Sequence, residues 1–281
     1  MDISLPKQIK LKGAKINFDV SSVGATGNAL MAATLAKGTT LINNAAIEPE
    51  ITQLAEFLSK MGARINGIGT NSIEVEGVAE LSSAEITTIP DRIESGTLLT
   101  AAAITNSEIT LKETSSEYLE AVLLKLEDAG CKISRDKSQV NINAKDFELK
   151  PVSVTTSIFP GFPTDMQAQW TALMSVVNGV STVTDTIYFD RFKHVPELSR
   201  LGAQIVLDQN TALITGVKKL KGAKVMSTDL RASASLVLAG LIAEGITEVL
   251  RVYHLDRGYQ RIEEKLKTLG ADIQRVATKD Y

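Results

Sequence analysis

The chain has 281 residues, of which 44% are apolar and 5% aromatic. This is enough for one large hydrophobic core or two modest ones. Thirty Lys and Arg against 33 Asp and Glu give a formal net charge of -3, and no basic run forms the stripe of a nucleic-acid-binding surface. The single cysteine, Cys131, excludes an internal disulfide framework, and two isolated histidines make a poor zinc site. Without a signal peptide or a long apolar span, we expect a cytoplasmic protein with no metal, cofactor, membrane or nucleic acid.

One structural repeat recurs along the chain. Four helix-like stretches end in Gly-Ala or Gly-Cys and are followed one residue later by isoleucine, at intervals of about 70 residues. Their glycines are Gly62, Gly130, Gly202 and Gly270. A glycine at this place fits a left-handed cap that ends the helix before a strand.

A second, more apolar helix precedes each of these stretches. We predict these helices at residues 28–37, 96–105, 166–177 and 232–244. The last is apolar on nearly every side, which predicts burial within a layer. Short β-branched or alternating runs predict strands at residues 39–42, 64–66, 72–76, 181–184, 204–207, 211–214 and 247–250. The fold class is therefore α/β with repeated units, and Pro90 after a polar stretch makes residues 86–91 a candidate hinge.

Unusual polar residues gather where each apolar helix begins. Exposed N–H groups and the helix dipole make such a start a potential anion site. At the first start, Ser21, Ser22 and Gly24 suit a phosphate, although plain N-capping by either serine explains them equally well. At the third start, Thr164 can cap the helix while Asp165 lies in the first turn.

Two arginines occupy equivalent places at the last two junctions. Arg231 and Arg257 could together bind a carboxylate or a phosphate. The alternative is that Arg257 pairs with Asp256 or Asp229 while Arg231 is solvated.

Taken in order, the junction motifs resemble those of the enolpyruvyl transferases that act on UDP-N-acetylglucosamine. They are SVGAT at 22–26, MAATLA at 31–36, EPE at 48–50, PDRIE at 90–94, FPTDMQAQ at 162–169, RFKHV at 191–195, TDLRASAS at 228–235 and HLDRGY at 254–259. The resemblance runs from about Lys12 to Val276 and implies an inside-out α/β barrel fold of six βαβαββ-type units, four of them present. Residues 1–89 would be the last third of the first domain, and residues 90–281 the second domain.

The resemblance implies transfer of the enolpyruvyl group from phosphoenolpyruvate to the sugar 3-hydroxyl, with phosphate release, in peptidoglycan precursor synthesis. It needs no metal. Asp165 would bind the 3-hydroxyl and take its proton, although a carboxylate at a helix start is a poor base unless desolvation raises its proton affinity. Arg231 and Arg257 would bind the phosphoenolpyruvate side. The UDP-sugar contacts would be Ser21, Ser22, Val23, Gly24 and Ile187, and further cleft residues would be Glu48, Asp91, Arg92 and Arg191.

The family segment that carries the catalytic loop has no counterpart in this chain. Cys131 cannot replace the loop cysteine, because it stands where the other repeats have alanine, which predicts a small buried residue. We therefore expect activity only with a complementary N-terminal segment. The alternatives are a non-catalytic UDP-sugar-binding remnant and, less favoured, a relative that acts on shikimate 3-phosphate.

Overall fold

The computed structural model describes residues 11–277. Contacts between Cα atoms divide the chain between Ile89 and Pro90 into two compact units, which we call the first unit and the second unit and describe separately. Residues 79–91, on both sides of this boundary, have no regular secondary structure.

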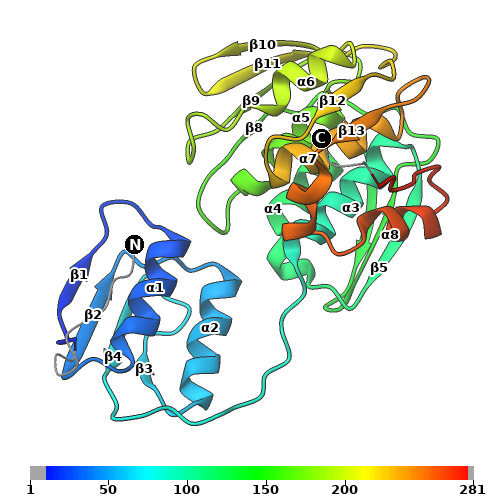
Figure 1. The fold of residues 1–281 in the computed structure, drawn as a ribbon. Helices are drawn as coiled ribbons and strands as arrows, with labels where there is room; N and C mark the ends of the chain where they lie inside the picture. Colours follow the sequence, from blue (N-terminus) through cyan, green and yellow to red (C-terminus); the bar gives the residue numbers. More distant parts are fainter. Residues whose placement is uncertain (1–10, 278–281) are drawn as a thin grey trace. The chain divides into compact units, whose positions relative to one another are not determined.

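The first unit is a four-stranded sheet covered on one face by two helices (Figure 1). Its elements are β1 (Lys15–Asn17), α1 (Val23–Ala33), β2 (Thr39–Asn43), α2 (Pro49–Lys60), β3 (Arg64–Asn66) and β4 (Ser72–Glu76). The strand order is β1-β2-β4-β3, with β1 parallel to β2 and the other pairs antiparallel. In β4 the burial alternates, so that Ile73 and Val75 face the helices and pack with Leu30 and Ile42.

The second unit contains three further copies of this order of elements, of which the first lacks the leading strand and the third lacks the last two strands among the described residues. The first copy is α3 (Arg92–Ile104), β5 (Glu108–Lys112), η1 (Ser116–Leu119), α4 (Glu120–Asp128), β6 (Lys132–Arg135) and β7 (Gln139–Asn143). The second is β8 (Val154–Thr155), η2 (Thr164–Met166), α5 (Gln167–Met174), β9 (Val180–Thr184), α6 (His194–Arg200), β10 (Gln204–Asp208) and β11 (Thr211–Thr215). The third is β12 (Lys224–Met226), α7 (Leu230–Gly240), β13 (Glu248–Leu250), η3 (Val252–Arg257) and α8 (Ile262–Thr268).

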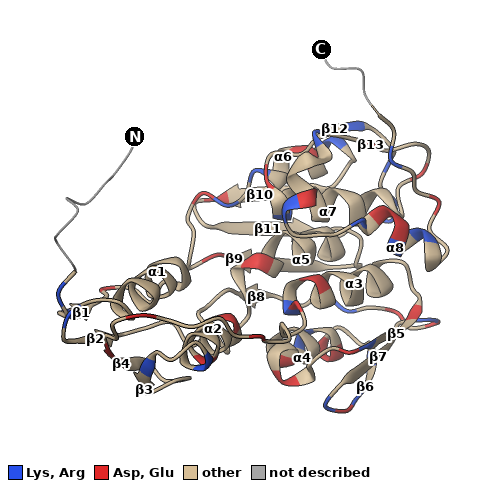
Figure 2. Ribbon diagram, turned by 60° about the horizontal axis from the view of Figure 1, so that its bottom comes forward, with Lys and Arg blue, Asp and Glu red and all other residues tan. Residues whose placement is uncertain are grey.

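Helices α3, α5 and α7 pack against one another in the centre of the second unit, and the sheets lie outside them (Figure 1). The sheet orders are β5-β7-β6, β8-β9-β11-β10 and β12-β13, so the described strands form open sheets and do not close into a barrel. Every residue of α5 is buried, as are residues 232–239 of α7. The predicted stretch 232–244 is therefore buried over its first eight residues only, because α7 ends at Gly240 and residues 240–244 are intermediate or exposed. Charges on α3 and α7 are confined to their first turns, and α5 has none (Figure 2).

The central helices contain many Ser and Thr residues, and several of their hydroxyls are satisfied within their own helices. Thr100 donates to the carbonyl of Gly96, Thr171 to that of Gln167 and Ser235 to that of Ala232, over 2.8–2.9 Å. A hydroxyl bonded to its own helix carries little penalty for burial. This explains how small polar residues can fill the centre of the unit.

The predicted glycine caps are confirmed. Gly62, Gly130, Gly202 and Gly270 have φ of 103°, 104°, 93° and 99°. After each glycine, the next N–H donates to a carbonyl five residues back, as from Ala63 to Leu58 over 3.0 Å, which ends the helix. In the first three cases the chain then enters a strand.

The α/β class is confirmed, but some predicted boundaries are wrong. Helices α1, α3 and α7 begin earlier than their apolar residues suggested, because Ser22, Asp91 and Asp229 cap them with their side chains. Helix α5 begins at Gln167, one residue later than predicted. In the last copy, residues 271–277 form no strand, and only the parallel pair of β12 and β13 remains.

Candidate functional site

A carboxylate held between two arginines is the most distinctive feature of the second unit. Asp165, in η2, contacts Arg191 through Oδ1 and Arg231 through Oδ2, and each O···Nη2 distance is 2.7 Å. Arg191 lies between β9 and α6, whereas Arg231 belongs to the first turn of α7. The Asp165 side chain is 35% exposed and that of Arg231 only 12%. One face of the carboxylate is therefore open to a ligand.

The electrostatic balance at Asp165 favours the ionised form. Burial raises the pKa of the Asp165 carboxyl, but the charges and hydrogen bonds of Arg231 and Arg191 outweigh this effect, so the pKa lies below its ordinary value. Burial also lowers the pKa of Arg231, and Tyr259 and Asp165 more than compensate, so that its pKa is raised. The Asp165 carboxylate and the guanidinium groups of Arg191 and Arg231 together carry one excess positive charge, which suits an anionic ligand.

Arg231 is oriented by a buried hydroxyl group. Its Nη1 donates to Tyr259 Oη over 3.1 Å, and the guanidinium lies 5.5 Å from the centre of the tyrosine ring. Tyr259 is fully buried, and its Oη also lies 2.9 Å from Thr97 Oγ1 and 3.1 Å from Gln169 Nε2. The starts of α3, α5 and α7 thus meet around one phenol, and this fixes the arginine that reaches Asp165.

Arg191 is oriented by a different network. The Asp185 carboxylate is fully buried, and its Oδ1 accepts hydrogen bonds from Thr156 Oγ1 over 2.8 Å and from the N–H groups of Ile187 and Tyr188 over 2.9 and 3.0 Å. Its Oδ2 accepts from Thr164 Oγ1 over 2.7 Å. Thr164 Oγ1 in turn accepts from Arg191 Nη1 over 2.9 Å.

Two of the predicted anion sites at helix starts are occupied by the protein itself. Asp91 accepts from the N–H groups of Ile93 and Glu94 at the start of α3. Asp229 accepts from those of Arg231 and Ala232 at the start of α7. A carboxylate already takes the place that a phosphate would need, so the anion interpretation is wrong for these two starts.

The start of α1, in the first unit, is different. Ser22 caps it by accepting from the N–H of Ala25 over 3.3 Å, as one of the two interpretations predicted. No acidic residue lies in this first turn, Val23 and Gly24 are exposed, and Ser21 precedes them. Open space surrounds the position that a Cβ on Gly24 would take. A ligand could therefore still approach this backbone closely.

The third start departs from its prediction. Thr164 does not cap a helix, because its hydroxyl is committed to Asp185. Residues 164–166 form a short 3-10 turn before α5. Asp165 thus differs from Asp91 and Asp229, because its oxygens bind arginine side chains rather than the N–H groups at the start of its helix.

The joint binding of a ligand's carboxylate or phosphate by Arg231 and Arg257 stays a prediction. Arg191 is the arginine that shares Asp165 with Arg231, while Arg257 lies exposed at the end of η3. The alternative, in which Arg231 is solvated, is wrong, because Arg231 is 12% exposed and binds Asp165. Asp256 binds Arg275 over 2.6 and 3.0 Å, so this proposed partner of Arg257 is engaged elsewhere.

The remaining predicted residues have local roles in the structure. Glu48 stands at the N-cap of α2, buried, with an Oε2 that finds no hydrogen-bond partner among the described residues. The Arg92 guanidinium lies 5.6 Å from the centre of the Phe159 ring. The N–H of Ile187 is bound by Asp185, which leaves its carbonyl as the backbone group for a ligand.

Cys131 is buried as predicted, and burial raises the pKa of its thiol to about 11. It is therefore a poor nucleophile or acid at neutral pH. Residues 11–277 hold no cluster of three or more His, Cys, Asp or Glu that could bind a metal ion. No helix within the same residues combines the length and apolarity needed to cross a bilayer.

Sequence reasoning missed Asp185, Tyr259 and Gln169. Gln169 and Tyr259 belong to the quoted motifs, but their sequence context signalled only packing, whereas Asp185 follows a strand without any motif. Asp185 could have been noticed as an acidic residue directly after a β-branched run, where a polar side chain at a strand end often contributes to a site.

Comparison with known proteins gives a consistent family. Residues 2–266 match the family described as EPSP synthase (3-phosphoshikimate 1-carboxyvinyltransferase). A protein of Chlorobium limicola described as UDP-N-acetylglucosamine 1-carboxyvinyltransferase is 57% identical over 97% of this chain and 64% of its own length. Its counterpart in Chloroherpeton thalassium is 58% identical over 99% of this chain and 65% of its own length. The chain thus spans a little under two thirds of these curated relatives.

Solved structures agree with this result. The enolpyruvyl transferase NikO from Streptomyces tendae superposes with a TM-score of 0.84 at 25% identity, covering 94% of this chain and 66% of its own. EPSP synthase from Acinetobacter baumannii, at 19% identity and a TM-score of 0.69 over 93% of this chain and 63% of its own, shares the fold. The chain belongs to the EPSP synthase family of carboxyvinyltransferases.

Proposed function

We propose that this chain is the larger part of an enzyme that transfers the enolpyruvyl group of phosphoenolpyruvate to the 3-hydroxyl of UDP-N-acetylglucosamine, releasing phosphate, in peptidoglycan precursor synthesis. The observation that carries the proposal is Asp165 between Arg191 and Arg231. This arrangement places a potential proton acceptor beside an excess positive charge, as an addition between a hydroxyl group and an anionic enol phosphate requires. The names of the curated relatives support the UDP-sugar as acceptor over shikimate 3-phosphate.

The reaction proceeds by addition and elimination. The sugar oxygen bonds to C2 of phosphoenolpyruvate, its proton passes to Asp165, and C3 takes a proton from an acid outside this chain. In the second step, C3 gives a proton back to the base left by that acid, and the C2–O bond to the phosphate group breaks, so that phosphate leaves with the electron pair of the bond. Arg231, with the exposed Arg257, stabilises the negative charge of the phosphoenolpyruvate side.

Asp165 must become a better base than its two ion pairs allow. An anion that binds Arg231 competes with Asp165 Oδ2 for the Nη2 donor, and loss of this contact raises the pKa of the carboxyl. Binding of phosphoenolpyruvate would thus prepare the carboxylate to accept the hydroxyl proton. For the UDP-sugar, the resemblance implies contacts with Ser22, Val23 and Gly24 at the start of α1 and with the Ile187 carbonyl, and each of these contacts stays a prediction.

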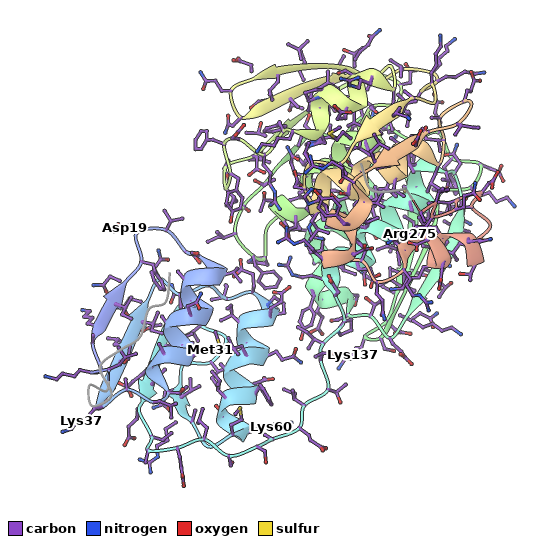
Figure 3. All side chains as sticks on the ribbon, in the orientation of Figure 1. Asp19, Met31, Lys37, Lys60, Lys137 and Arg275 are labelled. Carbon is purple, nitrogen blue, oxygen red and sulfur yellow. The ribbon has the colours of Figure 1, made fainter. Side chains whose placement is uncertain are left out.

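The first unit needs a partner to complete it. Val23 and Met31 on α1, and Leu35 in the turn directly after it, are 43%, 48% and 47% exposed. Met31 is labelled on α1 in Figure 3. Helices α5 and α7 stand at the same place in their copies of the repeat as α1 does in its own. Both bury their apolar residues against neighbouring central helices. We infer that this face of α1 packs against a complementary segment of the same repeat, which also carries the missing acid.

The test is phosphate release from phosphoenolpyruvate and UDP-N-acetylglucosamine, first with the 281-residue chain alone and then with the N-terminal third of the Chlorobium limicola relative. We expect activity in the mixture only. The matched control is Asp165→Asn, which should lower turnover by about 10²–10⁴-fold.

Two results would overturn the proposal. If the mixture releases no phosphate but still binds the UDP-sugar, the chain is the non-catalytic binding protein. Activity with shikimate 3-phosphate in place of the UDP-sugar would establish the other substrate.

A further inference from the structure

We propose that Asp185 is a positioning residue, which through the Thr164 hydroxyl holds Arg191 against Asp165 and at the same time fixes the turn that carries Ile187. This inference rests on the proposed function of the Asp165 site. It goes beyond that function by identifying the group that aligns the site.

The burial of Asp185 requires an explanation. A fully buried carboxylate is costly unless its oxygens are hydrogen-bonded. Asp185 receives four donors, two of them hydroxyl groups and two backbone N–H groups, and so its charge is stabilised by dipoles. Both oxygens are used, and they serve different parts of the structure.

Oδ2 sets the direction of the hydrogen bonds around Thr164. An ionised carboxylate can only accept, so the single hydroxyl hydrogen of Thr164 must point at Asp185. The lone pairs of Oγ1 are then free for Arg191, whose Nη1 donates to it over 2.9 Å. Arg191 is thereby held at two adjacent residues, through Nη1 at Thr164 and through Nη2 at Asp165.

Oδ1 fixes the turn that follows β9. It binds the N–H groups of Ile187 and Tyr188, and the Tyr188 ring lies 5.2 Å from the Arg191 guanidinium. One carboxylate therefore fixes both the turn that presents Ile187 and the arginine that contacts Asp165. A displacement of about 1 Å at a reacting group can cost about 100-fold in rate, so this coupling matters for turnover.

The first experiment compares Asp185→Asn with Asp190→Asn in the chain assembled with the N-terminal third of a relative. Asparagine at position 185 has one acceptor oxygen instead of two. Its N–H₂ group must therefore face either Thr164 or the N–H groups of Ile187 and Tyr188, and hydrogen bonds to that side are lost. Asp190 is an exposed carboxylate in the same loop. We expect Asp185→Asn to lower kcat by about 10–100-fold, and Asp190→Asn to leave it unchanged.

The pH profile separates positioning from a merely structural role. The charged groups at Asp165 are Arg191, before α6, and Arg231, on α7, with Tyr259 beyond Arg231. Loosening Arg191 removes one influence that lowers the pKa of Asp165. The acidic limb of kcat should therefore move to higher pH in Asp185→Asn.

Thr164→Val and Thr164→Ser provide the second pair of variants. Valine removes the hydroxyl link without changing any charge and should reproduce the loss of kcat and the shift of the acidic limb. Serine keeps the hydroxyl group and should restore both. If Asp185→Asn fails to fold, the Thr164 pair still decides the question.

Carboxyl ¹³C NMR of Asp165 in the 281-residue chain tests the inference independently of activity. A raised pKa in Asp185→Asn and Thr164→Val, but not in Asp190→Asn, supports it even if the assembled enzyme proves inactive. An unchanged Asp165 pKa in folded Asp185→Asn and Thr164→Val, or wild-type kcat and pH profile in both, would overturn it.

Discussion

At the residue scale, the chemistry of the second unit depends on how its few buried polar groups are paired. Asp165 has an arginine on each oxygen, and each arginine has a second anchor, Thr164 for Arg191 and Tyr259 for Arg231. The arginines cannot easily rotate away, because these anchors are themselves bound within the packed interior. The pKa of Asp165 is therefore low in the free protein. Under the proposed function, Asp165 becomes basic only when an anion draws Arg231 away from it.

Replacing Arg231 by glutamine tests this balance. Removing its charge should raise the pKa of Asp165, and acid unfolding should change accordingly. A lowered folded-state pKa contributes stability above the unfolded pKa, which is lost as the pH falls through the folded one. In Arg231→Gln, the loss of folding stability that Asp165 causes at low pH should be smaller than in wild type. The turnover of the assembled enzyme should fall by about 10²–10³-fold.

Carboxyl ¹³C NMR titration of Asp165 is the direct measurement. Arg275→Gln, which breaks a pair at the surface with Asp256, is the matched control. Equal Asp165 pKa values in wild type and Arg231→Gln would contradict the interpretation.

His194 gives a second prediction at this scale. It is fully buried at the start of α6, and burial together with Arg191, against the opposing charge of Asp229, lowers its pKa from 6.5 to about 4. Between pH 6.5 and pH 4, the His194 imidazole is therefore protonated in the unfolded chain but neutral in the folded chain. The free energy of unfolding falls as the pH drops through this range. The full loss from this residue is about 3 kcal/mol.

Urea unfolding of the second unit at pH 7 and pH 4.5 measures this loss. His194→Phe, which keeps a ring beside Phe192, should remove most of the difference between the two pH values. His254→Phe serves as the control. A difference that persists in His194→Phe would assign the pH dependence to other groups.

At the element scale, each repeat depends on the turn between its outer helix and the following strand. The four glycines there share a left-handed backbone, and at Gly62, Gly202 and Gly270 open space surrounds the position of a Cβ. The demand for glycine at these three positions is therefore conformational and not steric. At the N-termini of the central helices α3 and α7, Asp91 and Asp229 instead cap the helix with their side chains.

Gly202→Ala should lower the free energy of unfolding of the second unit by about 1–2 kcal/mol, because an L-residue is strained at φ near 93°. Asparagine tolerates this conformation better, so Gly202→Asn should cost less. Chemical denaturation of the two variants beside wild type is the measurement. Equal stability of all three proteins would show that the turn can relax.

At the scale of the whole molecule, the two units differ in how completely they bury their repeats. The second unit surrounds α3, α5 and α7 with sheets, whereas the first unit leaves one face of α1 exposed. An apolar face of this kind favours association. In calorimetry of the 281-residue chain without a partner, we therefore expect the first unit to unfold at low temperature with a broad transition. A single sharp transition in which both units of the monomer unfold together would contradict this.

The double substitution Met31→Lys and Leu35→Lys tests the role of this face. Both side chains are about half exposed, so the stability of the first unit should change by no more than about 0.5 kcal/mol. Association with the complementary segment should be lost, because two charges would have to be buried. Pull-down and light scattering measure it, with the exposed Glu56→Lys on α2 as control, and undiminished association would place the contact elsewhere.

Local features of the sequence were enough to predict the repeat, the α/β class, the glycine caps and the burial of α7. They act over a few neighbouring residues, through backbone preference and hydrophobic periodicity. The motifs also indicated Asp165 and Arg231 as functional residues. They did not show that Arg191 would share the Asp165 carboxylate with Arg231.

Only the tertiary structure decided the partners of the site. Tyr259 and Thr97 meet across 162 residues of sequence, and Arg231 reaches Asp165 across 66. Such contacts exist because three copies of the repeat pack their central helices together and bring the helix starts to one place. Local preference determines each copy, but the packing between copies determines which polar groups face one another, and the chemistry of the site depends on that packing.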